Sequence, residues 1–142
     1  MAITQAVSNS FKGQLLNGQH NFNTGGNVFK LALYNTNAVL DATYTSYLTT
    51  NECGASGQYA AGGGALTGQQ TSVDTGVGIV TFSNLSFTGV TLTASGAMIY
   101  NTSLTNAAVC VLSFGSAQTA TAGTFTIIFP TFTSSAAILR IE

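Results

Sequence analysis

Charged side chains are nearly absent from this sequence. Of its 142 residues, three are Lys or Arg and four are Asp or Glu, or 5%, whereas about 25% is usual for globular chains. A coiled coil or a charged helical bundle would need many more Glu and Lys residues. Three cations are also too few to neutralise a run of phosphates, so the composition argues against nucleic-acid binding.

Long apolar runs are missing as well. The longest covers residues 107–112, far short of the ~20 residues that span a bilayer. The N-terminus also lacks a basic region followed by an apolar stretch. We therefore expect no membrane partner, no cleaved signal peptide and synthesis in a cytosol. In that reducing compartment Cys53 and Cys110 are expected to remain free thiols.

Neutral polar residues take the place of charges, and threonine alone occurs 22 times. Such a surface provides little electrostatic repulsion between molecules. It also costs little to desolvate, because neutral hydroxyl and amide groups can form new hydrogen bonds across an interface. We therefore expect a protein fixed in an assembly, and a homo-oligomer, with a trimer as the first expectation.

Three parts of the chain supply candidate interface residues. The apolar segment 1–7 has no obvious place in a sheet, the irregular region 41–70 carries tyrosines that combine apolar area with a hydroxyl group, and the terminal strand would leave an apolar edge. The candidates are Ile3, Val7, Tyr44, Tyr47, Tyr59, Leu139 and Ile141.

One segment has helical periodicity. Within Ser8–Asn17, Phe11 and Leu15 are four residues apart, so they lie on one face of a helix. Ser8 is the expected N-cap, and Gly18 stands where a glycine commonly ends a helix. The pattern predicts one short N-terminal helix.

The remainder reads as strands and turns. Stretches rich in β-branched and aromatic residues predict strands at 28–34, 69–73, 77–82, 85–93, 96–101, 107–114, 124–129 and 136–141. Three of them are apolar on both faces, which is typical of strands packed from both sides. We predict a single mainly β domain over 1–142, an antiparallel β-sandwich or partly open barrel of about 7–8 strands. Residues 1–20 would form an N-terminal arm and helix, and 41–70 a long loop or hairpin.

The triplet Asp74-Thr75-Gly76 is the sharpest catalytic motif. Aspartic proteases place such a triplet in each half of the molecule or in each protomer, so that two aspartates share a proton. Here the preceding residues are more polar than the buried strand those enzymes need, and no apolar-apolar-Gly element follows. We interpret the triplet as a turn between strands 69–73 and 77–82.

No other catalytic, cofactor or metal motif is found. His20 is the only histidine, and neither the four carboxylates nor the two cysteines stand at ligand spacing from it. A structural histidine is the favoured interpretation. The run Gly62-Gly63-Gly64 lacks the Gly-Lys-Ser/Thr ending that binds phosphate, so it indicates a flexible loop. We expect no enzyme activity and no cofactor.

Several segments together resemble a family of small virion proteins of tailed bacteriophages, over nearly the whole chain. They are Ile3-Thr4-Gln5, Asn9-Ser10-Phe11-Lys12, Leu15-Leu16, Phe29–Tyr34, Thr50-Asn51-Glu52, Gly57 with Tyr59 and Gly62-Gly63, Ala97–Asn101 and Ala122–Ile127. Cys53 departs from the pattern, since a small or aliphatic residue is expected there. The shared motifs are structural, and no binding residue can be carried over from them.

The resemblance implies a head decoration or cement protein that binds the major capsid protein. It also implies assembly in the host cytoplasm and a final location in the virion. Two alternatives remain. One is a tail or head fibre module that binds host surface glycans through 41–70, and the other, more distant, is a homodimeric aspartic protease.

Overall fold

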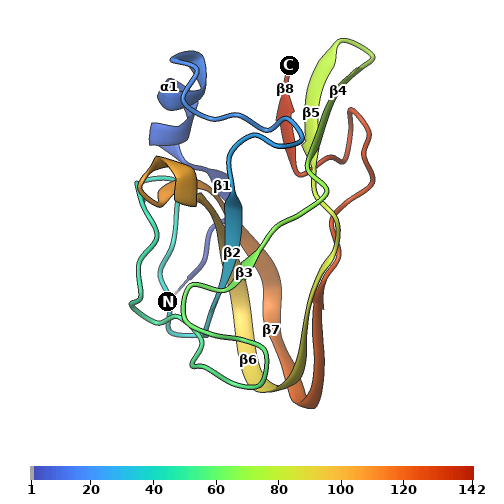
Figure 1. Ribbon diagram of the computed structural model, residues 1–142. Helices are drawn as coiled ribbons and strands as arrows, with labels where there is room; N and C mark the ends of the chain where they lie inside the picture. Colours follow the sequence, from blue (N-terminus) through green and yellow to red (C-terminus); the bar gives the residue numbers. More distant parts are fainter. Residues whose placement is uncertain (1) are drawn as a thin grey trace.

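A computed structural model describes residues 2–142 and contains two antiparallel sheets and one short α-helix (Figure 1). The larger sheet has the strand order β1-β7-β6-β2-β3, and the smaller has the order β4-β5-β8. This arrangement confirms the predicted mainly β, sandwich-like fold. The elements are β1 (Ala6–Val7), α1 (Asn9–Leu16), β2 (Phe29–Tyr34), β3 (Gly64–Ala65), β4 (Gln70–Asp74), β5 (Val77–Thr81), β6 (Leu85–Asn101), η1 (Thr102–Leu104), β7 (Ala107–Ile127) and β8 (Leu139–Ile141).

The hairpin of β6 and β7 forms the centre of the fold. Each strand joins two segments that the sequence predicted as separate strands. The pairing register between β6 and β7 shifts where the two segments of each strand meet: Ala94 pairs with Gln118, whereas Gly96 pairs with Ser113. The surplus residues on β7 include Gly115, whose φ of 79° favours glycine. Figure 1 shows both strands bending back at the bottom of the view, so that the hairpin folds over on itself.

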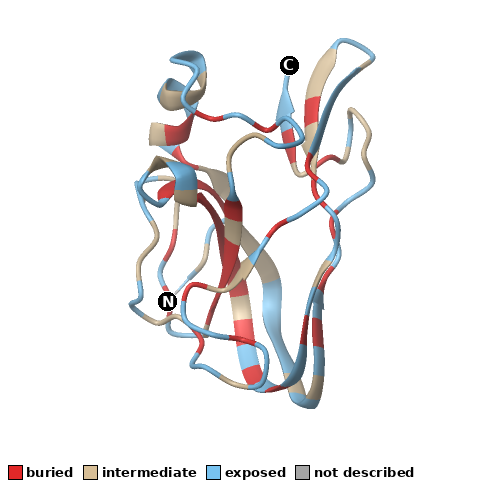
Figure 2. Ribbon diagram, in the orientation of Figure 1, coloured by how far each residue is buried: buried red, intermediate tan, exposed pale blue. Residues whose placement is uncertain are grey.

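Apolar side chains fill both faces of the large sheet. The main core includes Phe29, Leu31 and Leu33 of β2, together with Val90 of β6. A second cluster on the opposite face includes Tyr34 and Met98, and the residues that follow β2 pack over it. Figure 2 shows the buried residues concentrated along the central strands. Strand β2 is thus buried on both sides.

The N-terminal region confirms the predicted helix and corrects the prediction for the arm. Ser8 is the N-cap of α1 and Gly18 follows with a φ of 72°, but the Ser8 side chain makes no capping hydrogen bond. The arm does have a place in the sheet: β1 pairs with Val111 and Cys110 of β7, and Ile3 forms a parallel bridge with Leu40. Strand β1 has only two residues, which is too short for an alternating pattern to be recognised in the sequence.

Residues 75–139 contain no Lys, Arg, Asp, Glu or His. This uncharged segment runs from the end of the β4–β5 turn through β5, β6 and β7 to the start of β8. Its polar surface therefore consists only of hydroxyl, amide and backbone groups. The few charges lie between residues 12 and 74 and at positions 140 and 142.

Candidate functional site

Of the seven candidate interface residues, two are buried, four are partly buried and one is exposed. Tyr59 is 1% exposed and Leu139 is 6% exposed, so both belong to the core and are withdrawn as interface residues. Ile3, Tyr44 and Tyr47 are partly buried against the second core cluster, and Val7 against the main core. Ile141 is exposed at 61%. Tyr47 and Tyr59 face inward because their hydroxyl groups are held by a contact that the sequence did not reveal.

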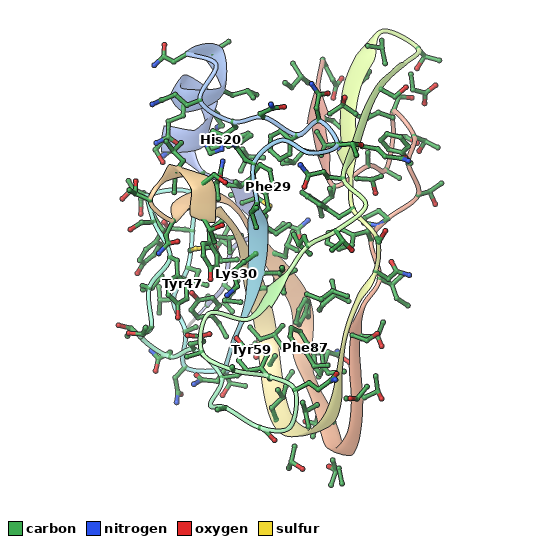
Figure 3. All side chains as sticks on the ribbon, in the orientation of Figure 1. His20, Phe29, Lys30, Tyr47, Tyr59 and Phe87 are labelled. Carbon is green, nitrogen blue, oxygen red and sulfur yellow. The ribbon has the colours of Figure 1, made fainter. Side chains whose placement is uncertain are left out.

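Glu52 is that contact for two tyrosines. Its carboxylate accepts hydrogen bonds from the hydroxyl groups of Tyr47 (2.6 Å) and Tyr59 (2.8 Å) and from the backbone N–H of Gly62 (2.7 Å). The Tyr47 ring also stacks on Tyr100, with 4.7 Å between ring centroids. One carboxylate thus ties the two ends of the 47–62 segment together. Figure 3 labels both tyrosines.

The chemistry of this cluster is structural. Burial raises the pKa of the Tyr59 hydroxyl well above its ordinary value, and the Glu52 carboxylate raises it further. The pKa of Tyr47 is raised for the same two reasons, burial first. Both hydroxyl groups therefore stay protonated and act as donors. The buried Tyr59 ring packs against Phe87 with centroids 4.9 Å apart, so it is not accessible to a sugar ring.

The same loop covers the outer edge of β6. The Gln58 N–H donates to the Thr88 carbonyl (3.0 Å), and the Thr88 N–H donates to the Gln58 side-chain oxygen (3.0 Å). The Thr91 N–H donates to Ser56 Oγ (2.8 Å). Backbone groups that would otherwise point into solvent are thereby satisfied. This edge of the hairpin is closed.

The outer edge of β7 is different. Strand β1 pairs only with Cys110 and Val111, and the Gln5 side chain reaches the Ser113 N–H (3.2 Å). Within residues 2–142, no other strand pairs with the outer edge of β7 beyond that point. A groove of about 440 Å³ lies beside this edge, and its apolar lining includes Phe114, Phe125 and Ile138. This side of the sandwich is open.

A second groove lies between α1 and the small sheet and has a volume of about 780 Å³. Phe11 and Leu15 line it from the helix, and Val80 and Leu139 from the sheet. Leu16 and Ile141 at its border are 88% and 61% exposed. The molecule thus presents two apolar depressions, one at a strand edge and one between two elements.

The Asp74 triplet forms the predicted turn. Thr75 and Gly76 have φ values of 48° and 84°, as in the two-residue turns that join antiparallel strands, here β4 and β5. The Asp74 carboxylate accepts a hydrogen bond from the Ser134 N–H (2.6 Å). Its role in this fold is to fasten the segment before β8 to the turn.

His20 is buried, in agreement with its interpretation as a structural residue. Its Nδ1 lies 3.0 Å from Asn101 Nδ2 and its Nε2 lies 2.9 Å from Gln14 Oε1. These partners fit a neutral ring that accepts at Nδ1 and donates at Nε2. Burial lowers the pKa of His20 below its ordinary value, which also favours the neutral ring.

Cys53 and Cys110 are both buried and unpaired. Burial raises the pKa of the Cys53 thiol to about 11 and that of Cys110 to about 12. Neither thiol is therefore activated as a nucleophile. Among residues 2–142 there is no cluster of three His, Cys, Asp or Glu side chains that could hold a metal ion, and no helix in that range is long and apolar enough to cross a membrane.

Comparisons with protein-family models, with curated proteins and with solved structures found no match to this chain. The assignment of a function therefore depends on the surface itself. Sequence reasoning recognised the charge depletion that shapes this surface. It did not recognise the Glu52 cluster or the open edge of β7.

Proposed function

We propose that this chain is a non-enzymatic structural protein of a bacteriophage virion. It acts as a cement or decoration protein that binds the major capsid protein and stabilises the head lattice. It is assembled in the host cytoplasm and stays in the particle. The observation that carries this proposal is a surface nearly free of charge that also has an open strand edge and apolar grooves.

Such a surface suits permanent attachment. Exposed ion pairs contribute only about 0–1 kcal/mol each and are screened by salt, and this chain has few charges with which to form them. Apolar contact and neutral hydrogen bonds hold over a wide range of ionic strength. Binding to a lattice at several points would add avidity. We therefore expect attachment that survives high salt.

The resemblance to small phage virion proteins points to the same role. A non-enzymatic role also agrees with the geometry of the acidic residues: Glu52 is engaged with tyrosine hydroxyl groups and Asp74 with a backbone N–H. Tyr59 of the 41–70 region is buried, and Tyr47 is engaged with Glu52 and Tyr100, so neither residue favours the fibre alternative.

The test is to find the protein in intact particles of the phage that encodes it. Quantitative mass spectrometry of purified virions, together with antibody labelling in the electron microscope, would give its copy number and position. We expect labelling over the whole shell, in numbers comparable with the major capsid protein. Labelling at a single vertex would favour a fibre module, and absence from the particle would refute a virion role.

A further inference from the structure

We propose that the open edge of β7 is a docking site for a second copy of this chain, which pairs through its own β7 edge in antiparallel fashion around a two-fold axis. The proposal rests on the geometry of this edge and is independent of the virion role. It predicts a dimer, where the sequence led us to expect a trimer.

The first support is the direction of the backbone groups. The Phe129 N–H donates to Asn84 Oδ1 (2.9 Å), next to the start of β6. Because N–H groups alternate sides along a strand, the N–H of Thr126 points to the outer edge. Ser86 Oγ and Thr126 Oγ1 are 3.0 Å apart, as expected for directly opposed residues in a pair without mutual backbone hydrogen bonds.

The second support is the lack of protection on this edge. Soluble β proteins usually guard exposed edges with charged residues, proline or a covering loop. Strand β7 contains neither a charge nor a proline, its own extra residues lie before Gly123, and the loop that guards the hairpin covers β6. Since the edge is uncharged, the β7 edges of two copies can approach each other without like-charge repulsion.

The third support is the groove beside the edge. Phe114 and Phe125 lie there with ring centroids 6.2 Å apart, and Ile128, at its border, is 74% exposed. An added strand would supply the missing hydrogen-bond partners and would cover this apolar opening. Strand addition to a sheet edge works in this way: the main chain gives affinity and the adjoining pockets give specificity.

The test compares Thr126→Pro with Thr50→Lys and the unmodified protein by sedimentation at several concentrations. Proline at an outward-facing N–H is tolerated in an edge strand, and it removes a donor from the proposed interface. A second edge variant, Thr124→Lys, introduces like charges across the two-fold. Thr50 is an exposed threonine in a loop outside the edge, so its replacement by lysine controls for added charge.

We expect the unmodified protein and Thr50→Lys to dimerise equally, and both edge variants to raise the dimer Kd at least about ten-fold, or 1.4 kcal/mol. Hydrogen exchange should show protection of the Thr126 amide that disappears on dilution, which tests the edge even if a variant misfolds. A monomer at all concentrations would refute the proposal. So would a dimer that both folded edge variants leave intact, or one with an unprotected Thr126 amide. These outcomes do not depend on whether the protein is found in virions.

Discussion

The two outer edges of the β6–β7 hairpin belong to the same ribbon and have similar compositions, yet one is covered and the other is open. On β6, Ser56 and Gln58 satisfy the backbone of Thr88 and Thr91. On β7, the outer edge runs from Phe114 to Ile127 without a strand partner among residues 2–142. The comparison teaches that the tertiary position of a loop, rather than strand composition, decides which edge is available.

The cover on β6 depends on two local features of the loop. Gly57 has a φ of 51°, and its Cα lies so close to the Gly89 carbonyl that an added Cβ would overlap it. Glu52 and its three donors hold the remainder of the loop against the sheet. Disturbing either feature should expose β6 and make the two edges alike.

The largest effect is expected for Gly57→Ala. The new Cβ would collide with the Gly89 carbonyl, and a left-handed backbone conformation is strained for alanine. We expect a loss of about 3 kcal/mol in unfolding free energy, measured by urea denaturation. Gly89→Ala is the matched control, since it has a φ of 64° but open space around its Cβ; it should cost only about 1 kcal/mol. Equal losses for the two variants would show that contact with β6 is unimportant.

Glu52→Gln is expected to cost about 2 kcal/mol. The neutral amide has one acceptor oxygen and cannot replace both carboxylate oxygens toward two tyrosine hydroxyl groups and one N–H. Hydrogen exchange of the Thr88 and Thr91 amides should accelerate at the same time, because the cover on β6 loosens. Glu142→Gln, at an exposed position, is the control and should change stability by less than about 0.5 kcal/mol. Unchanged exchange of the Thr88 amide would show that the Glu52 cluster does not hold the loop on the edge of β6.

Gln58→Ala tests the edge contact alone. It removes the acceptor of the Thr88 N–H, and a single hydrogen bond of this kind contributes about 1 kcal/mol. Gln118→Ala on β7 is the counterpart, because Gln118 bonds only to nearby Ser116 and should be nearly neutral. Thermal or urea unfolding of the pair measures the difference directly. Equal effects would mean that the cover contributes nothing to stability.

The smallest effect is expected from pH, and it should leave both edges unchanged. The pKa of His20 is lowered in the folded protein, so the unfolded chain takes up a proton first as pH falls below the usual histidine value of about 6.5. Stability is complete above that pH and declines below it, by up to about 1 kcal/mol near pH 5.5. His20→Gln should remove this dependence in urea titrations at the two pH values. A decline that persists in the variant would assign it to another group.

The sequence predicted the helix and the strand segments better than it predicted which segments form one continuous strand. Stretches rich in β-branched and aromatic residues identified β2 and β5, and Ser8 and Gly18 marked the two ends of α1. The continuity of β6 and β7 was missed because the Gly and Ser residues around Gly96 and Gly115 have the composition of turns. They form a bend within the strands instead. Composition cannot distinguish a bend within a hairpin from a turn between strands when the partner strand is unknown.

The candidate site was harder to predict than the fold. Tyrosines clustered in an irregular region read as surface anchors, but Tyr47 and Tyr59 turn inward because one carboxylate and two aromatic partners are brought to them by tertiary structure. Whether a strand edge is free to pair likewise depends on the order of the strands in the sheet. A pattern with a period of two shows which side chains share a face, and it contains no information about which neighbour a strand has.

The uncharged segment has a practical consequence for detecting the protein. Trypsin cleaves after Lys and Arg, and between Lys30 and Arg140 the chain contains neither. A tryptic digest therefore leaves a single large fragment from Leu31 to Arg140, and amine-reactive cross-linkers find lysines only at positions 12 and 30. Standard proteomic searches would undercount this protein in any particle that holds it. Cleavage at aromatic residues gives the peptides needed for a copy number, because Phe and Tyr are distributed along the chain.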